Sequence, residues 1–96
     1  MIIEGFIWLA DVIDKLEHKH AVAKTEVEGV FGDLPVFNRI ERGKVKGEDL
    51  FRALGKTDSG RYLAVFFIYK TTREALVISA REMTEKERKQ YAKRKK

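Results

Sequence analysis

Two arginines at the outer ends of a pair of apolar segments have the clearest potential for chemistry. Arg61 directly precedes the apolar run 62–69, and Arg81 directly follows the apolar run 75–80. Two such runs joined by a short polar segment are typical of an antiparallel hairpin at the centre of a sheet. The outer ends of a hairpin lie at the same edge of the sheet, so we expect the two guanidinium groups to lie close together. Since guanidinium presents a planar fork that matches phosphate oxygens, the pair predicts an anion site.

The alternative for these arginines is a structural role, in which each pairs with a nearby carboxylate such as Glu82 or Glu48. Arg52, Arg73 and Arg88 are weaker candidates for phosphate contacts on the same chemical basis.

Histidine and tyrosine supply candidate groups for proton transfer. Histidine is the only side chain whose ordinary pKa lets it exchange protons near neutrality. His18 and His20 are two positions apart on a predicted helix, so they point to different faces and cannot chelate a metal together. On spacing alone, His20 is better explained as a cation at a helix C-terminus. Tyr91 is the lone aromatic of a basic helix, where an anchoring role is favoured over base stacking or proton donation.

Other cofactor signals are absent from the sequence. The chain has no cysteine, no further spacing suited to metal ligands and no glycine pattern for binding nucleotides. We therefore expect neither a metal nor another cofactor.

The elements that must position these residues follow from periodicity and turn chemistry. An apolar strand is expected at 2–9, and a helix at 9–20 from the stripe of Leu9, Val12, Ile13 and Leu16. A capping box from Thr25 to Glu28 predicts a second helix that ends at Gly32-Asp33, and a capping box from Thr84 to Glu87 predicts the last. Further strands are expected at 36–42 and at 50–54, the latter ended by Gly55, with a turn at 57–60 before the hairpin.

This order predicts a single α+β domain spanning residues 1–96. Two N-terminal helices should pack on one face of a mainly antiparallel sheet of about four to five strands, followed by a basic C-terminal helix.

The charge distribution is uneven. Residues 1–34 hold three lysines and seven carboxylates, a formal charge of −4, whereas residues 35–96 hold 17 cations and eight carboxylates, a charge of +9. The basic part could meet a polyanion. The lack of a secretory signal or a long apolar stretch predicts a soluble cytoplasmic protein that does not bind membranes.

Several segments together resemble the BrnT family of toxins. They are the string GKTDSGRYL from Gly55, VISAR from Val77, MTEKER from Met83 followed by Tyr91, and, nearer the N-terminus, Trp8, the pair Lys19-His20 and the pair Val30-Phe31. The resemblance implies a compact fold like that of RelE-type ribonucleases and a toxin that arrests translation by cutting RNA. It also implies a cognate antitoxin as partner, and operator DNA bound by the complex of the two. The recurrent polar residues of the family correspond to Lys19, His20, Arg61, Arg81, Arg88 and Tyr91.

Two positions depart from the family's pattern. Ala21 replaces the glycine usual after the Lys-His pair, which alters how His20 is presented. Leu76 stands where an arginine often precedes the "IISAR" strand, which removes one cation.

The resulting hypothesis is metal-independent cleavage of mRNA through attack of a ribose 2′-hydroxyl on the adjacent phosphate. Arg61, Arg81 and Arg88 would stabilise the phosphorane, and either His20 or Tyr91 would transfer protons. The residues expected to hold the RNA are Lys19, Arg52, Lys56, Arg73, Lys86 and Lys89. The alternative is a non-catalytic module, such as a degenerate toxin, that binds nucleic acid or an antitoxin.

Overall fold

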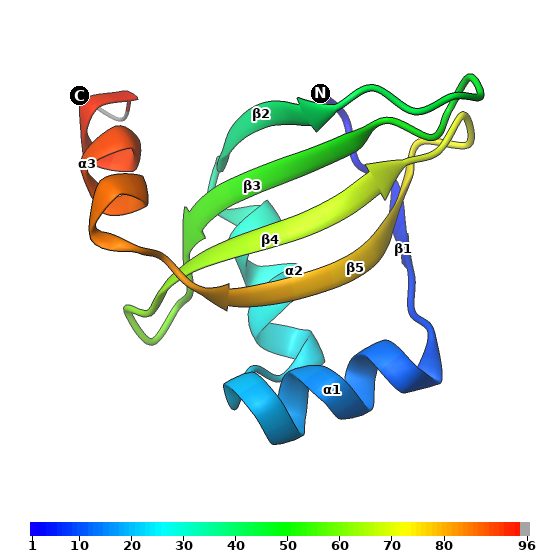
Figure 1. The fold of residues 1–96 in the computed structure, drawn as a ribbon. Coiled ribbons are helices and arrows are strands. Elements are labelled where there is room, and N and C mark those ends of the chain that lie inside the picture. Colours follow the sequence, from blue (N-terminus) through cyan, green and yellow to red (C-terminus); the bar gives the residue numbers. More distant parts are fainter. Residues whose placement is uncertain (95–96) are drawn as a thin grey trace.

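The computed structural model describes residues 1–94, which form a five-stranded sheet with helices on both of its faces (Figure 1). The chain order is β1 (Gly5–Ile7), α1 (Ala10–His20), α2 (Lys24–Gly32), β2 (Val36–Glu41), β3 (Leu50–Lys56), β4 (Tyr62–Tyr69), β5 (Glu74–Glu82) and α3 (Glu85–Arg94). This arrangement confirms the α+β class, the two N-terminal helices and the C-terminal helix. Lys95 and Lys96, the last residues of the predicted basic tail, lie outside the described residues.

The sheet has the strand order β1-β5-β4-β3-β2, with the central hairpin formed by β4 and β5. The neighbours from β2 to β5 are antiparallel, and β1 is parallel to β5, so the sheet is mainly antiparallel as predicted. β1 is shorter than the predicted strand 2–9 because it pairs with β5 only over Gly5, Phe6 and Ile7. The chain then leaves the sheet, and Leu9 caps α1.

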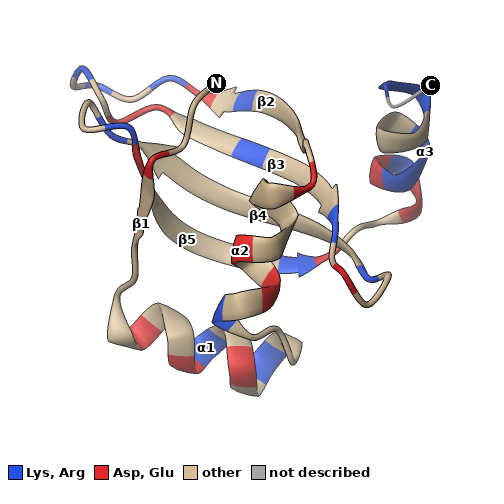
Figure 2. Ribbon diagram, turned by 180° about the vertical axis from the view of Figure 1, so that it is seen from behind, with Lys and Arg blue, Asp and Glu red and all other residues tan. Residues whose placement is uncertain are grey.

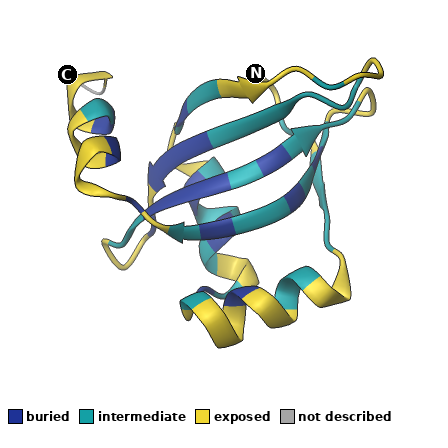
Figure 3. Cartoon of the chain, viewed as in Figure 1, coloured by how far each residue is buried: buried dark blue, intermediate teal, exposed yellow. Residues whose placement is uncertain are grey.

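Helices α1 and α2 cover one face of the sheet, as expected from their apolar stripes. Leu16 of α1 and Val27 and Val30 of α2 are fully buried against Val65 and Phe67 of β4. Figure 3 shows the buried positions concentrated where the helices meet the strands. Aromatic side chains extend this core, since the ring of Phe31 packs edge-on against those of Phe6 and Phe67 at centroid distances of 5.1 and 5.2 Å.

The start of α2 differs from the prediction. The helix begins at Lys24, and its first-turn cap is Glu26, whose Oε1 accepts a 2.9 Å hydrogen bond from the backbone N–H of Ala23. The predicted partner of Thr25, Glu28, instead accepts a hydrogen bond from the indole N–H of Trp8. A tertiary contact therefore outweighs the local capping pattern.

Gly55 does not end β3, which continues to Lys56. A Cβ at this position would lie 2.7 Å from Cγ1 of Val30 in α2. The glycine is thus required for close approach of the helix to the sheet, not for a turn.

Helix α3 packs on the opposite face of the sheet. Tyr91 and Met83 are buried with Leu54 of β3 and Ala64 of β4. The predicted capping box is confirmed: the backbone N–H of Thr84 donates to Glu87, and the backbone N–H of Glu87 donates to the Thr84 hydroxyl. Within the described residues, no helix is both long and apolar enough to cross a membrane.

Candidate functional site

The end of the sheet where β4 begins and β5 finishes gathers most of the candidate residues. Arg61 is held there by a tight turn, in which Gly60 has a φ of +93°. Two hydrogen bonds close the turn. The backbone N–H of Thr57 donates to the Arg61 carbonyl at 2.8 Å, and the backbone N–H of Arg61 donates to the Thr57 hydroxyl at 2.9 Å. The turn therefore fixes the position of the Arg61 backbone at the end of the sheet where β4 begins.

The Arg61 guanidinium links β5 with the junction between α1 and α2. Its Nη1 donates to the carbonyl of Ala21 at 2.8 Å and to both carboxylate oxygens of Glu26, while Nη2 donates to Glu82 at 3.1 Å. Burial opposes the charge, but the hydrogen bonds to Glu26 and Glu82 raise the pKa of Arg61 above its ordinary value.

His20 and Lys19 form the last turn of α1, and Arg61 contacts the carbonyl of Ala21, the residue that follows this turn. Ala21, the next residue, adopts the left-handed conformation with φ 52° and ψ 42° and ends the helix. Glycine takes this conformation most readily, so the alanine here carries a steric cost that glycine would not. His20 is half-buried, Lys19 is exposed, and the Ala21 carbonyl brings the Arg61 guanidinium next to the end of the helix.

Arg88 and Lys56 reach the site across the ring of Tyr62, which sequence reasoning did not single out. The Arg88 guanidinium carbon lies 3.9 Å from the centroid of the Tyr62 ring, and Lys56 Nζ lies 5.6 Å from it. A hollow of about 220 Å³ is lined by Arg61, Tyr62 and Arg88, together with Gly60, Glu82 and Met83. Arg61 and Arg88 therefore face one hollow, which is large enough for a phosphate group. No local signal in the sequence pointed to Tyr62, because the cations on its ring come from β3 and α3.

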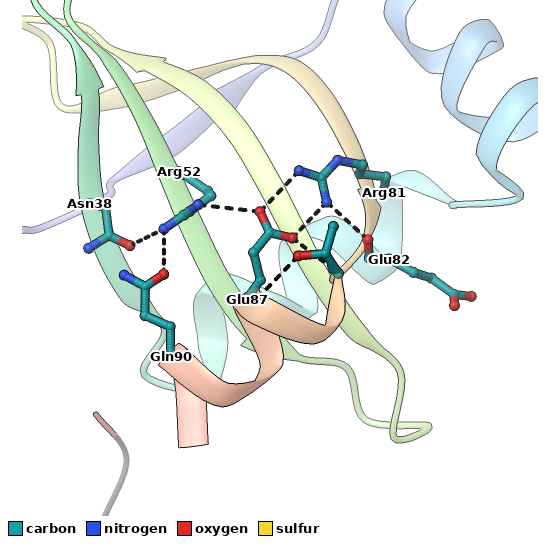
Figure 4. A network of polar contacts seen from close by, with 7 residues as sticks. Asn38, Arg52, Arg81, Glu82, Glu87 and Gln90 are labelled. Atoms are coloured by element: carbon teal, nitrogen blue, oxygen red, sulfur yellow. Dashed lines mark hydrogen bonds and ion pairs between the residues drawn. The ribbon is translucent and has the colours of Figure 1, made fainter. Parts of the chain in front are cut away.

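Arg81 belongs to a different polar network on the α3 side of the sheet (Figure 4). Its guanidinium makes two hydrogen bonds to Glu87, at 2.7 and 3.0 Å, and one to the backbone carbonyl of Glu82. Glu87 has only 6% of its side chain exposed and also pairs with Arg52 at 3.3 Å. Burial alone would raise the pKa of Glu87, but the hydrogen bonds from Arg81 and Thr84 lower it below its ordinary value.

Arg52 was predicted to hold RNA, but its side chain is only 16% exposed. Its Nη2 donates to Asn38 at 2.9 Å and to Gln90 at 3.0 Å, and its buried Nε has no hydrogen-bond partner. Through these contacts Arg52, on β3, connects β2 with α3.

The expected single anion site made by Arg61 and Arg81 is not what the structure contains. The two residues lie at the same end of the sheet, as the hairpin geometry required, but their side chains point to opposite faces. Arg61 reaches the α2 side through Glu26, whereas Arg81 is opposite Ala64 on the α3 side. Arg61 is paired with Glu26 and Glu82, and Arg81 shares Glu87 with Arg52. Of the two carboxylates suggested by the sequence, Glu82 does contact Arg61, whereas Glu48 pairs with Lys70 instead.

The remaining candidates are dispersed. Tyr91 is 8% exposed, its ring packs edge-on against Tyr62, and burial raises its pKa, so its placement favours the anchoring role. Lys86 and Lys89 are exposed on α3, and Lys89 pairs with Glu85. Arg73 pairs with Glu4 beyond the far end of β4. Since β4 has eight residues, at about 3.4 Å each it separates Arg73 from Arg61 by roughly 25 Å.

Charged residues are distributed unevenly over the elements of the fold. Figure 2 shows carboxylates together with some lysines on α1 and α2, and cations at the end of β5 and, alongside carboxylates, on α3. Within the described residues, no group of three or more His, Asp or Glu side chains is arranged to hold a metal ion.

The fold and this site define a small α+β protein with a cation-rich sheet end. The model of the family described as the ribonuclease toxin, BrnT, of type II toxin–antitoxin systems matches residues 10–87. The chain belongs to this family of ribonuclease toxins, whose partner is a cognate antitoxin. A comparison with curated proteins gives no significant match.

Proposed function

We propose that this protein is a metal-independent endoribonuclease that cleaves mRNA in the cytoplasm and thereby arrests translation. The observation that carries the proposal is the hollow shared by Arg61 and Arg88 in a chain of the BrnT family, with Arg61 also hydrogen-bonded to the Ala21 carbonyl after α1. Two guanidinium groups facing one small hollow suit a phosphate that gains charge during reaction. As a toxin of a type II pair, the protein would also bind operator DNA in complex with its antitoxin.

In the proposed reaction the ribose 2′-oxygen forms a bond to the adjacent phosphorus, and the bond from phosphorus to the 5′-oxygen breaks. A base removes the proton of the 2′-hydroxyl, and an acid protonates the leaving 5′-oxygen, so the products are a 2′,3′-cyclic phosphate and a 5′-hydroxyl. Arg61 and Arg88 would stabilise the phosphorane between these two steps.

His20 is the better supported candidate for proton transfer. It is half-buried at the end of α1 and next to the Ala21 carbonyl that Arg61 contacts. Tyr91, in contrast, is nearly buried and has a raised pKa, so at neutral pH its phenol would not act as a base. Arg81 would act indirectly, by fixing α3 and hence Arg88 through Glu87.

The RNA backbone would be held by exposed cations near the hollow. Lys56 lies near the Tyr62 ring that lines the hollow, and Lys86 and Lys89 belong to α3, the helix of Arg88. Lys19 is in the last turn of α1, two residues before the Ala21 carbonyl that Arg61 contacts. Arg52 and Arg73 are less suited, since the first is buried in the Glu87 network and the second lies at the far end of the sheet.

A second candidate function is a non-catalytic toxin relative that binds its antitoxin or nucleic acid. The specific observation that favours it is the pairing of Arg61 with two carboxylates and of Arg81 with Glu87, which Arg52 shares. Expression of the protein without antitoxin separates the two candidates. Growth arrest with cleaved mRNA, and cleavage by the purified protein in EDTA, would support the ribonuclease; normal growth with intact mRNA would support the binder.

A further inference from the structure

Part of the sheet face that carries α3 is apolar and uncovered. The strand register aligns Leu50 of β3, Ile68 of β4 and Leu76 of β5 in one row. Ile7 of β1 continues this row on one side, and the exposed Glu41 of β2 ends it on the other. We call Leu50, Ile68 and Leu76 the aliphatic strip. They lie on the same face as Arg52 and Arg81, are half-buried, and pack against neither buried core cluster. Figure 3 shows α3 at one end of this face and the rest of the face open.

The chemistry of the strip is suited to a protein and not to RNA. Sheets that bind single-stranded RNA present aromatic rings on which bases stack. The strip is aliphatic, and in the adjoining row the ring of Phe66 is occupied by the Arg81 guanidinium, 5.2 Å from its centroid. Aliphatic side chains instead offer a surface against which the apolar side chains of a protein partner can pack.

Cations flank the strip at both ends of the sheet. Beyond one end, in the loop between β2 and β3, Arg42, Lys44 and Lys46 form no ion pair with any described residue. At the other end, the same holds for Lys86 and Lys93 of α3. A partner that combines apolar side chains with carboxylates would complement both features.

We propose that the aliphatic strip is a docking surface for an acidic, amphipathic segment of the cognate antitoxin. This inference rests on the toxin role proposed above and adds the surface and the chemistry of the partner. A segment lying along the strip would continue over Phe66 and Arg81 toward α3. It would thus cover the approach to Arg88 and keep RNA from the hollow.

The test uses two variants of equal shape, Leu76→Gln and Leu76→Glu, with calorimetric measurement of binding to the purified antitoxin. Loss of the apolar contact should weaken binding ~10-fold for Leu76→Gln, and the added repulsion should weaken it ~100-fold for Leu76→Glu. Leu9→Ser is the control, because Leu9 is an exposed leucine that lies outside the strip and precedes α1 on the other side of the sheet. It should bind within about twofold of the unchanged protein.

A second measurement uses the unchanged protein, so it tests the proposal even if the variants do not fold. In the unchanged protein, the methyl resonances of Ile68 and Leu76 should shift when antitoxin is added, while that of Leu9 should not. Unshifted methyl groups, or wild-type affinity in both variants, would overturn the proposal. Equal binding by the Gln and Glu variants would overturn the acidic character of the partner.

Two other outcomes would also overturn it. If the variants lose RNA cleavage but keep antitoxin affinity, the strip is an RNA surface; if the free protein is a dimer that Leu76→Glu dissociates, the occupant is a second copy. Failure of the proposed function is distinguishable, because an unchanged protein that cleaves no RNA can still show the methyl shifts.

Discussion

At the scale of single residues, the site depends on how firmly each carboxylate holds its arginine. Glu26 is 24% exposed and is fixed in the first turn of α2, whereas the side chain of Glu82 is 71% exposed and makes one hydrogen bond to Arg61. Exposed ion pairs contribute only about 0–1 kcal/mol. Glu82 is therefore the partner that a phosphate group can displace from Arg61.

Neutralising Glu82 should strengthen RNA binding. We expect Glu82→Gln to lower the dissociation constant for RNA about two- to fivefold at low salt, because Arg61 loses a competing anion. Fluorescence anisotropy with a labelled single strand would measure it. Glu4→Gln is the matched control, since Glu4 is an exposed carboxylate that pairs with Arg73 at the far end of the sheet and not with Arg61; an equal gain in both variants would mean that only net charge matters.

The left-handed residue after α1 gives a prediction about stability. Ala21→Gly should raise the free energy of unfolding by about 0.5–1 kcal/mol, because glycine adopts a positive φ without the steric cost that alanine has. Urea unfolding would measure the change. Ala92→Gly, inside α3, should have the opposite sign at about 1 kcal/mol; a loss of stability in Ala21→Gly would contradict the conformational argument.

At the scale of the elements, a buried carboxylate and an aromatic ring are the buried residues through which α3 contacts the sheet. Glu87 receives hydrogen bonds from Arg81 of β5 and Arg52 of β3, while Tyr91 packs against Tyr62 of β4. A helix with so few apolar side chains needs such specific contacts to stay docked. Glu87 thereby controls where α3 presents Arg88.

Replacing the Glu87 carboxylate should lower the free energy of unfolding by an amount that depends on pH. The pKa of Glu87 is lowered by folding, so its contribution is present above the ordinary value of 4.5 and is lost as the pH falls through the lower value of the folded state. We expect Glu87→Gln to reduce the free energy of unfolding by about 2 kcal/mol at pH 7, and by much less below the folded-state pKa.

Glu85→Gln on the same helix is the control, since its side chain is 87% exposed. Its effect at pH 7 should stay within about 0.5 kcal/mol. Denaturant unfolding of both variants across the acid range would measure the difference. A loss that is the same at every pH would argue against the charged network.

At the scale of the whole molecule, local patterns predicted the elements but not the partners of their charged residues. Alternating and unbroken apolar runs specified the hairpin, and the Thr84 capping box specified the start of α3, because these signals lie within a few residues of each other. The pairing of Arg61 with Glu26 joins residues 35 positions apart, and no local pattern encodes it. For the same reason the roles of Gly55 and Tyr62, which depend on α2 and α3, were not predictable.

The arrangement of the charges also predicts how binding depends on salt. For single-stranded nucleic acid, each phosphate contact contributes a slope of about −0.7 to the logarithm of affinity against the logarithm of salt concentration. Arg88→Gln should reduce the steepness by about 0.7, whereas Arg73→Gln, at the far end of β4, should leave it unchanged. Anisotropy titrations across a range of salt concentrations would measure both slopes, and equal changes would mean that RNA contacts the whole sheet.

Primer extension on RNA incubated with purified protein tests the central claim most directly. We expect discrete stops with the unchanged protein, a loss of cleavage rate of about 10²–10³ in Arg61→Ala, and normal cleavage in Arg39→Ala. Arg39 is a suitable control because it is an arginine of β2 that pairs with Asp49 and does not line the hollow. Intact RNA with the unchanged protein, or cleavage by Arg61→Ala at the normal rate, would contradict the account.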